Sequence, residues 1–500
     1  MDRLVTQSLI LEGGVMSNLP TIDQGMRFPG SLQFGQNLEP DYDGGYSRVQ
    51  GYTKYDAATV DGSGSPVLGT WVYGNTISAV AGTNLYTSTG SGWTNKSSAS
   101  SFSSSTGLYI GETFTFSTAV ETLIIVNGTD YPATWNGSSF VRLSIAQAST
   151  YVTAHKHHMF YSKGQIVSIS AAGNHLTLSG GAAINVGHEV TAMVSYRDAV
   201  YCLGPKGISK ITGSSASDWA LEAISKTVGI VSPRTLQEVN GDIVFLSYDG
   251  IRSIASTDKL DDINLENLSR NIEKNIKDSI QPVTGKSVSS LILNSKNQYR
   301  LFISDSSYSR GTQPGFLGAL RKQSQGGVAW EWFTTKGFEV NCAGQGIIST
   351  VETAVHGDFD GYVYQEELGD SFDGDNIAVT LKTPYWSFND PEMRKTLHKL
   401  RSYVTATDNV SPNYQMTLDY LDASRPQPAA LNGATATGTF SKYGTATYGS
   451  SVYSGGVTFA TDFHLIGTCF NAALTISSSD TNVPYTVQSL NIQYGVGGRK

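Results

Sequence analysis

Residues 67–81 are Val67-Leu-Gly-Thr-Trp-Val-Tyr-Gly-Asn-Thr-Ile-Ser-Ala-Val-Ala81, two apolar runs separated by a Gly-Asn turn pair. Leu85-Tyr86 and Trp93 follow, so about four short strands fit into roughly 30 residues. The same alternation of apolar run and turn recurs at 122–141, 190–211, 236–254, 288–333 and 353–364. A single unit of this kind cannot bury both faces of its sheet. Closing about six or seven units into a ring buries these faces and leaves few exposed sheet edges. The pattern therefore predicts an all-β protein with an irregular β-propeller, and stacked β-sandwiches are the alternative.

Composition limits the classes of protein to which the chain can belong. Only 15% of its 500 residues are charged, whereas soluble proteins average about 25%. Its 26 Tyr, 19 Phe and 7 Trp supply enough apolar area for large cores, which excludes a disordered chain. The formal charge of −8 argues against a protein whose main task is to hold nucleic acid. The start of the chain lacks the apolar core of a secretory signal, and no run approaches the roughly 18 apolar residues of a membrane span.

The chain is expected to fall into three parts. Residues 1–65 contain many turn formers and predict an extended N-terminal arm that leads into the first strands. The propeller is expected over 66–376. Within it, an amphipathic helix near 262–281 is predicted between two blades and packed against them, because apolar residues recur there at helical spacing: Ile263, Leu268, Ile272, Ile276 and Ile280.

After residue 376 apolar residues alternate strictly, as in Tyr414, Met416 and Leu418, and a C-terminal β-sandwich is predicted over 377–500. Residues 433–456 form a low-complexity tract with Tyr-Gly pairs and are expected to be a long hairpin that orders against a neighbour. The stretch 390–402 begins like a helix, but a turn followed by a strand is preferred.

No side-chain constellation in the sequence predicts catalysis. Phosphate-binding Gly-rich loops, Gly-x-Ser-x-Gly elbows and the Ser-x-Asp-x-Gly-x-x-Trp turns of propeller hydrolases are missing. His155 and His157 would share a strand face, as a metal pair does, but ordinary core or solvent-exposed histidines are preferred. Asp370, Asp373 and Asp375 lack the spacing of a calcium loop, and a turn is preferred. We therefore expect no enzyme, no metal and no cofactor.

Three cysteines, Cys202, Cys342 and Cys469, are widely separated and odd in number. They match no zinc-site spacing, so buried free thiols made in a reducing cytoplasm are expected.

Several short blocks follow one another in a fixed order along the chain. They are Asn37-Leu-Glu-Pro40 with Gly44-Gly-Tyr-Ser-Arg-Val-Gln-Gly-Tyr52, Val194-Ser-Tyr-Arg-Asp198 leading to Ile211-Thr-Gly-Ser-Ser215, Gly229-Ile-Val-Ser-Pro-Arg234 running into 241–252, Thr383 to Lys395, and Tyr494-Gly-Val-Gly-Gly-Arg499. In this order they resemble the tail nozzle proteins of short-tailed bacteriophages, also known as tail hub, tail tubular protein B-like or packaged-DNA stabilisation proteins. Each block is short, and their order carries the resemblance.

The resemblance implies a virion structural protein of the short tail, synthesised in the cytoplasm of the bacterial host. Nozzle subunits form a ring, expected to be a hexamer, below the portal and the head-to-tail adaptor, and the phage DNA is retained and ejected through its lumen. Tail fibre or tail tip proteins are further expected partners, and contact with DNA is expected to be transient. Residues expected at contacts between subunits are Tyr385, Trp386, Arg394, Lys395, Arg401, Tyr443, Tyr448 and Tyr453.

Two other functions stay open. A carbohydrate-binding or depolymerising phage propeller would use the abundant aromatic residues to stack on sugars. It would also need two carboxylates roughly 5–9.5 Å apart for cleavage. A protein-interaction propeller of the host cytoplasm is the third possibility.

Overall fold

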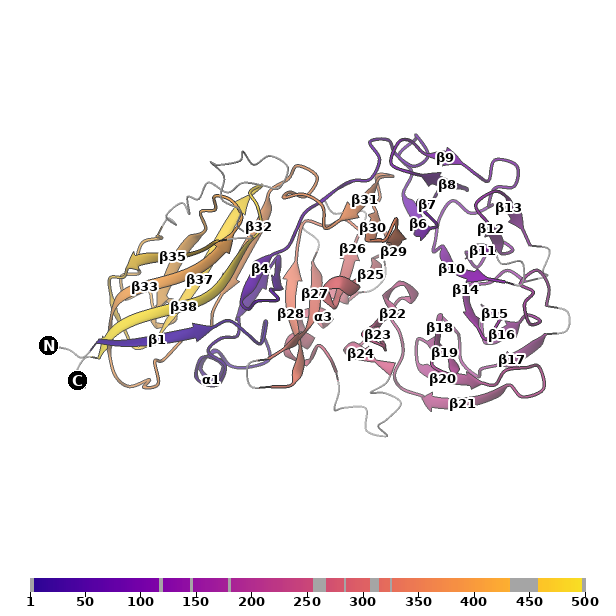
Figure 1. Ribbon diagram of the computed structural model, residues 1–500. Helices are drawn as coiled ribbons and strands as arrows, with labels where there is room; N and C mark the ends of the chain where they lie inside the picture. Colours follow the sequence, from indigo (N-terminus) through magenta and orange to yellow (C-terminus); the bar gives the residue numbers. More distant parts are fainter. Residues whose placement is uncertain are drawn as a thin grey trace.

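A ring of small antiparallel sheets occupies one half of the molecule and a β-sandwich the other half (Figure 1). The computed structural model describes residues 4–116, 120–143, 147–178, 181–254, 267–282, 285–305, 314–323, 326–431 and 457–496.

The ring begins with four sheets of four strands each, in chain order. Their strands are β6 (Val67–Tyr73), β7 (Thr76–Ala81), β8 (Asn84–Ser88) and β9 (Thr94–Asn95); β10 (Ile110–Thr115), β11 (Glu121–Val126), β12 (Ala133–Trp135) and β13 (Phe140–Arg142); β14 (Tyr151–His155), β15 (His158–Lys163), β16 (Ile166–Ile169) and β17 (Ala182–Asn185); β18 (Ala192–Tyr196), β19 (Ala199–Gly204), β20 (Gly207–Thr212) and β21 (Ala220–Ser225). The Gly74-Asn75 pair turns the chain between β6 and β7, with Gly74 at a φ of 56°, which glycine adopts without strain.

Three further groups of strands complete the ring. They are β22 (Gln237–Val239), β23 (Asp242–Ser247) and β24 (Gly250–Ser253); β25 (Ser287–Leu293), β26 (Gln298–Ser304), β27 (Gly315–Lys322) and β28 (Val328–Thr335); and β29 (Cys342–Ile348), β30 (Val351–Gly357) and β31 (Val363–Glu366) with β5 (Tyr52–Lys54). Because β5 pairs with β31, a strand from the start of the chain ties the ring shut. Within the described residues six sheets are separate blades, and β25–β28 stand between two of them as part of a larger sheet. The predicted irregular propeller is confirmed.

The sandwich consists of two sheets, one of which continues from the propeller. The strand β2 (Phe34–Gln36) pairs with β28 on one side and β32 (Ile377–Lys382) on the other, followed by β37 (Ala472–Asp480) and β34 (Asn413–Leu418). The facing sheet contains β3 (Leu38–Pro40), β4 (Tyr46–Arg48), β38 (Tyr485–Val496), β33 (Lys395–Ala406), β35 (Val457–His464), β1 (Leu4–Ile10) and β36 (Thr468–Cys469). Its alternating residues, such as Leu400 and Ile492, are buried against Met416, which confirms the C-terminal sandwich.

Residues 4–54 of the expected N-terminal arm are distributed over both halves. The strand β1 pairs with β38, β2 lies inside the shared sheet, and β5 closes the propeller. A short helix, α1 (Thr21–Arg27), which the sequence did not predict, follows Pro20. The 1–65 segment therefore holds the two halves together.

The predicted helix is present over its second half. A 3₁₀ turn, η2 (Arg270–Ile272), leads into α3 (Glu273–Ile280), while residues 255–266 lie outside the described part. Ile272, Ile276 and Ile280 are buried in the core that links the propeller and the sandwich, so the expected packing is confirmed. The preferred turn and strand at 390–402 are also confirmed, since Asp390 caps a turn that enters β33. None of the described helices has the length and apolar character needed to cross a membrane.

A buried network of charges, which we call the joint, connects the two halves. The Arg300 guanidinium on β26 lies 3.2 Å from the carboxylate of Glu366, 2.5 Å from that of Glu367 and 3.4 Å from that of Glu39 on β3. Lys296 pairs with Glu39 at 2.8 Å and also with Glu367. Because every one of these charges has an opposite neighbour, the network stays buried without an isolated ion.

Candidate functional site

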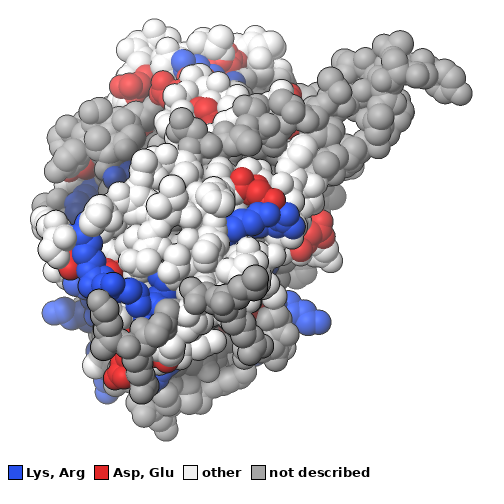
Figure 2. Space-filling model, turned by 90° about the vertical axis from the view of Figure 1, so that its left-hand side faces the viewer, with Lys and Arg blue, Asp and Glu red and all other residues white. Residues whose placement is uncertain are grey.

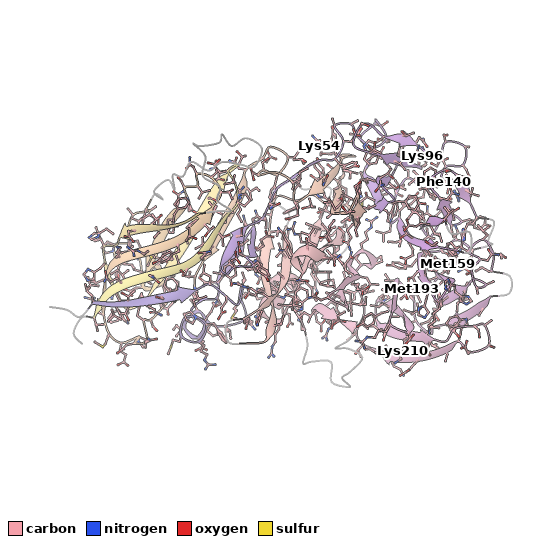
Figure 3. The ribbon with its side chains drawn as sticks, in the orientation of Figure 1. Lys54, Lys96, Phe140, Met159, Met193 and Lys210 are labelled. Carbon is pink, nitrogen blue, oxygen red and sulfur yellow. The ribbon has the colours of Figure 1, made fainter. Side chains whose placement is uncertain are left out.

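The inner strands of the ring surround a hollow, which we call the axial cavity. Two adjoining spaces of about 630 and 330 Å3 share five lining residues, which are Glu112, Tyr151, Leu236, Gln237 and Gln345. Further lining residues come from β6, β18 and β25, so every inner strand contributes. Met193 of β18 lies toward the axis, whereas Lys210 of β20 lies toward the outside of the ring (Figure 3). Both volumes fall within the usual size of small-molecule sites.

Glu112 lines both spaces of the axial cavity, and a second glutamate, the exposed Glu238, lines the larger space. Glu112 stands on β10, its side chain is partly exposed to the cavity, and the backbone N–H of Ala154 donates to it. Burial between the surrounding walls raises the pKa of this carboxyl to about 7, and the N–H bond opposes the rise only in part. Within the described residues no basic side chain forms an ion pair with Glu112. The carboxyl is therefore present in both protonation states near neutral pH.

Arg234 lines the smaller space, is half-buried and has no acidic partner within the described residues. Its guanidinium donates to the carbonyl of Asn341 at 2.7 Å and to the carbonyl of Leu68. Burial lowers its pKa, although an arginine stays charged at any working pH. These bonds join the segment before β22 to β6 and to the start of β29, so Arg234 fixes the wall of the cavity.

Two glutamine side chains supply neutral hydrogen-bonding groups. Gln345 accepts from the backbone N–H of Ile292 at 2.8 Å and donates to Gln237 at 3.3 Å. Gln237 donates in turn to the carbonyl of Ser290 at 3.2 Å. Each amide nitrogen keeps a second N–H, and these two positioned donors belong to two different blades of the ring, those of β22 and β29.

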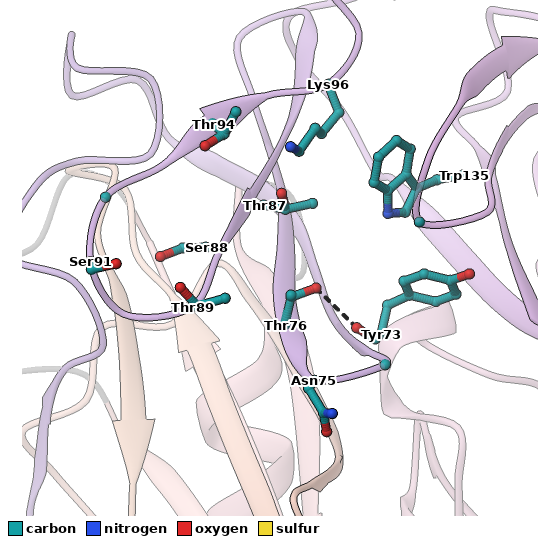
Figure 4. Close-up of a pocket in the computed structure, with 13 residues that line it drawn as sticks. Tyr73, Asn75, Thr76, Thr87, Ser88, Thr89, Ser91, Thr94, Lys96 and Trp135 are labelled. Carbon is teal, nitrogen blue, oxygen red and sulfur yellow. Dashed lines mark hydrogen bonds between the residues drawn. The ribbon is translucent and has the colours of Figure 1, made fainter.

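A second pocket of about 440 Å3 lies between the first two blades (Figure 4). Tyr73 and Trp135 flank it, with exposed fractions of only 8% and 4%, and Lys96 lies 5.9 Å from the indole ring. Thr76 donates to the carbonyl of Tyr73 at 2.9 Å. Because both rings are nearly covered, they do not offer an open face for stacking, and the axial cavity is the stronger candidate site.

The structure corrects the expected exposure of Tyr385 and Trp386. Their exposed fractions are 5% and 1%, and both pack inside the sandwich half. The indole N–H of Trp386 donates to the carbonyl of Pro29 at 2.9 Å, and the ring of Tyr385 lies 4.5 Å from that of Tyr420. Their aromatic area is therefore used within the chain and is not free for a neighbouring subunit.

The basic residues of the same region have partners inside the chain as well. Lys395 is buried and donates to the carbonyls of Asp390 and Phe470, while Arg394 lies over the Phe470 ring. The acidic partner of Arg401, 2.6 Å away, is Asp462 on the adjacent strand, which also binds Lys399. Within the chain, β33 and β35 therefore place these opposite charges side by side.

The remaining expected contact residues, Tyr443, Tyr448 and Tyr453, lie outside the described residues. The sandwich end of the molecule presents a broad uncharged area with charged side chains toward its rim (Figure 2).

The histidines and cysteines occupy structural positions. His155 is buried and bonds Ser195 at 2.8 Å, whereas His157 takes a left-handed turn conformation with a φ of 64°. Across the described residues no three His, Cys, Asp or Glu side chains are placed to hold a metal ion. Burial raises the pKa of the Cys202 and Cys469 thiols to about 12 and that of Cys342 to about 11. All three are buried and unpaired, as the sequence predicted.

Sequence reasoning missed Glu112, Arg234, Gln237 and Gln345. Each stands alone in its segment, and no motif or spacing connects them. The one available signal was a carboxylate in the first strand of a blade, because in a propeller that strand faces the axis.

No family model matches this chain, and no curated protein matches it. Among solved structures, an ancestral GH74 enzyme aligns with a TM-score of 0.41 and 11% identity, over 68% of this chain and 51% of its own. An exo-β-1,3-galactanase from Phanerochaete chrysosporium, solved with galactose, aligns with a TM-score of 0.28 and 10% identity, over 89% of this chain and 100% of its own. PorZ, a bacterial surface component of the type-IX secretion system of Porphyromonas gingivalis, aligns with a TM-score of 0.37 and 12% identity. This alignment covers 68% of this chain and 43% of PorZ. The chain thus spans about half the length of the ancestral enzyme.

The expectation that the chain is not an enzyme is corrected by these comparisons, since two of the three aligned structures are enzymes. Missing sequence motifs therefore do not exclude catalysis on this architecture. The aligned enzymes assign no substrate and no catalytic residue to this chain.

Proposed function

We propose that this chain is a tail nozzle subunit of a short-tailed bacteriophage. It would form a ring, a hexamer, below the portal and the head-to-tail adaptor, and phage DNA would leave through the lumen of that ring. Support comes from the ordered sequence blocks and from a fold that combines a propeller with a sandwich. Tail fibre or tail tip proteins would complete its set of partners.

The position of the first sequence block carries this proposal. Residues 37–52 lie between the propeller and the sandwich, where Glu39 joins the buried network around Arg300. Arg48 is buried and pairs with Asp480 at 2.9 Å, and Tyr52 stacks on Phe372 with ring centroids 4.9 Å apart. The segment that contains the first block is thus the segment that holds the two halves in one orientation. A rigid subunit of this kind suits a ring whose lumen carries DNA.

The oligomeric state of the purified chain tests this proposal. Native mass spectrometry at micromolar concentration, with and without the adaptor and portal of the same phage, should detect a ring near six subunits in at least one of the two conditions. Only monomers in both conditions would refute the nozzle. The formal charge of −8 also predicts weak binding of duplex DNA, which a fluorescence titration at two salt concentrations measures.

A carbohydrate-binding or carbohydrate-cleaving propeller is the second candidate function. The observation that favours it is the axial cavity, where a carboxyl with a pKa of about 7 stands among neutral amides. Perturbed carboxyls in a cavity are a frequent mark of binding or catalytic sites. Binding to a glycan panel and release of reducing ends from polysaccharides test this candidate separately from assembly.

A further inference from the structure

The walls of the axial cavity carry mainly uncharged polar groups. Amide side chains come from Gln237, Gln345, Asn240, Asn294 and Asn297, and hydroxyl groups from Tyr151, Thr153 and Ser195. An amide offers a donor and an acceptor side by side, which matches two neighbouring hydroxyl groups of a sugar ring.

An aromatic ring adds a second, independent feature. Trp71 on β6 lines the smaller space and is only partly buried. Gly69 and Gly111 make room for it, because a Cβ at Gly111 would stand 2.5 Å from the indole nitrogen and one at Gly69 would stand 2.5 Å from the ring edge. An indole beside polar groups provides an apolar surface against which the C–H groups of a sugar can pack.

We propose that the axial cavity binds a neutral saccharide, with Glu112, Gln237 and Gln345 bonding its hydroxyl groups and Trp71 packing against its ring. This inference rests on the second proposed function and narrows it to one site and one class of ligand.

The charges of the cavity favour a neutral ligand over an acidic or basic one. The Arg234 guanidinium donates to two backbone carbonyls of the wall, and the carboxyl groups of Glu112 and Glu238 line the same cavity, so a carboxylate ligand would meet negative as well as positive charge. A basic ligand would meet the positive charge of Arg234 as well as the carboxyl groups of Glu112 and Glu238. Transfer of a charged ligand into this space would cost the desolvation of its charge without a matching ion pair.

Glu112 can bond a sugar hydroxyl in either protonation state. The ionised carboxylate accepts from the hydroxyl, and the protonated carboxyl donates to it. The bond to the ionised carboxylate and the bond from the protonated carboxyl differ in strength. The affinity for the saccharide should therefore change between pH 6 and 8.

The test is saturation-transfer NMR and calorimetry with neutral oligosaccharides of two to six glucose, galactose or xylose units. Wild-type protein should bind at least one panel member with an affinity that changes around pH 7. Glu112→Gln should abolish this pH dependence, and Gln345→Leu should weaken binding at least about tenfold, as expected for lost bonds to a polar ligand. Glu121→Gln, an exposed glutamate of the same blade, is the matched control and should behave as wild type. If Gln345→Leu does not fold, the isosteric Glu112→Gln and Ser195→Ala still decide the question.

The outcomes distinguish an error in the site, an error in the ligand class and an error in the second function. Oligosaccharide binding that both cavity variants leave unchanged would overturn this site but keep a carbohydrate-binding propeller. Tighter binding of glucuronate or sialic acid than of every neutral sugar would overturn the ligand class. Failure of wild-type protein to bind or cleave any panel member at millimolar concentration would overturn the site and the second function together.

Discussion

Charged side chains are buried at the joint and half-buried in the axial cavity, and these two regions are built in opposite ways. At the joint, the Arg300 guanidinium contacts three carboxylates, and Lys296 contacts two of the same three. In the axial cavity, Glu112 and Arg234 each lack an opposite partner within the described residues. The difference shows which buried charges the fold has already neutralised and which remain free to act on a ligand.

The pKa shifts follow the same division. Burial alone would lower the pKa of Arg300, but Glu367, Glu366 and Glu39 raise it overall. Burial alone would raise the pKa of Glu367, and Arg300 and Lys296 hold it below its usual value. For Glu112 no such neighbour compensates, and burial raises its pKa. At the joint, opposite charges offset the cost of burial, so the arginine and the glutamates stay ionised. In the axial cavity no such neighbour offsets this cost, and the carboxyl of Glu112 titrates near neutral pH.

The largest expected effect comes from breaking the joint. Arg300→Met leaves three carboxylates close together without their main counter-charge, which should lower the free energy of unfolding by about 3–5 kcal/mol. Urea unfolding at pH 7 measures this loss. Lys274→Met is the matched control, because its pair with Asp278 is exposed and should contribute no more than about 0.5 kcal/mol. Equal losses in the two variants would mean that the joint does not stabilise the fold.

A smaller effect of opposite sign is expected in the axial cavity. The pKa of Glu112 rises from 4.5 to about 7 on folding, so the folded state loses stability as the pH rises through this window. Glu112→Gln removes the cost of holding an ionised carboxylate in the cavity. It should stabilise the protein at pH 8 by at most about 3 kcal/mol, with little change at pH 4.5. Denaturant midpoints at both pH values test this, and Glu121→Gln should show no such pH dependence. Destabilisation at pH 8 would show that the carboxylate of Glu112 is compensated after all.

The smallest effect is expected where paired charges are exposed. Asp462→Asn frees Lys399 and Arg401 on the surface of the sandwich, where water and salt screen their interaction. Its thermal midpoint should shift no more than that of Lys274→Met, and assembly should be unaffected because the contact lies within one chain. A larger shift would place Asp462 among the residues that hold the sandwich together.

Local sequence patterns predicted most of the elements. The alternation of Tyr414, Met416 and Leu418 indicated β34, and the spacing of Ile272, Ile276 and Ile280 indicated α3. These predictions succeeded because strands, turns and helices respond to residues only a few positions apart. The short helix α1 was missed because its seven residues offer only one apolar pair at helical spacing, Ile22 and Met26, and both side chains are exposed.

The site could not be predicted in the same way. The wall around Glu112 contains Tyr151, Gln237 and Gln345, which are far from it along the chain. Tyr385 and Trp386 were assigned to the surface because their sequence does not reveal that Pro29 and Tyr420 cover them. Burial is a property of the neighbours that a side chain acquires on folding, and these come from distant segments.

The sequence by itself determined that the chain forms many short strands, that these belong to a propeller and a sandwich, and that one helix interrupts them. Tertiary structure decided that β1, β2 and β5 join the two halves, and that ring closure encloses Glu112. The physical reason is that hydrogen bonds and side-chain alternation within a strand act over a few residues. The pairing of distant strands and the solvation of a buried carboxyl depend on the whole closed ring.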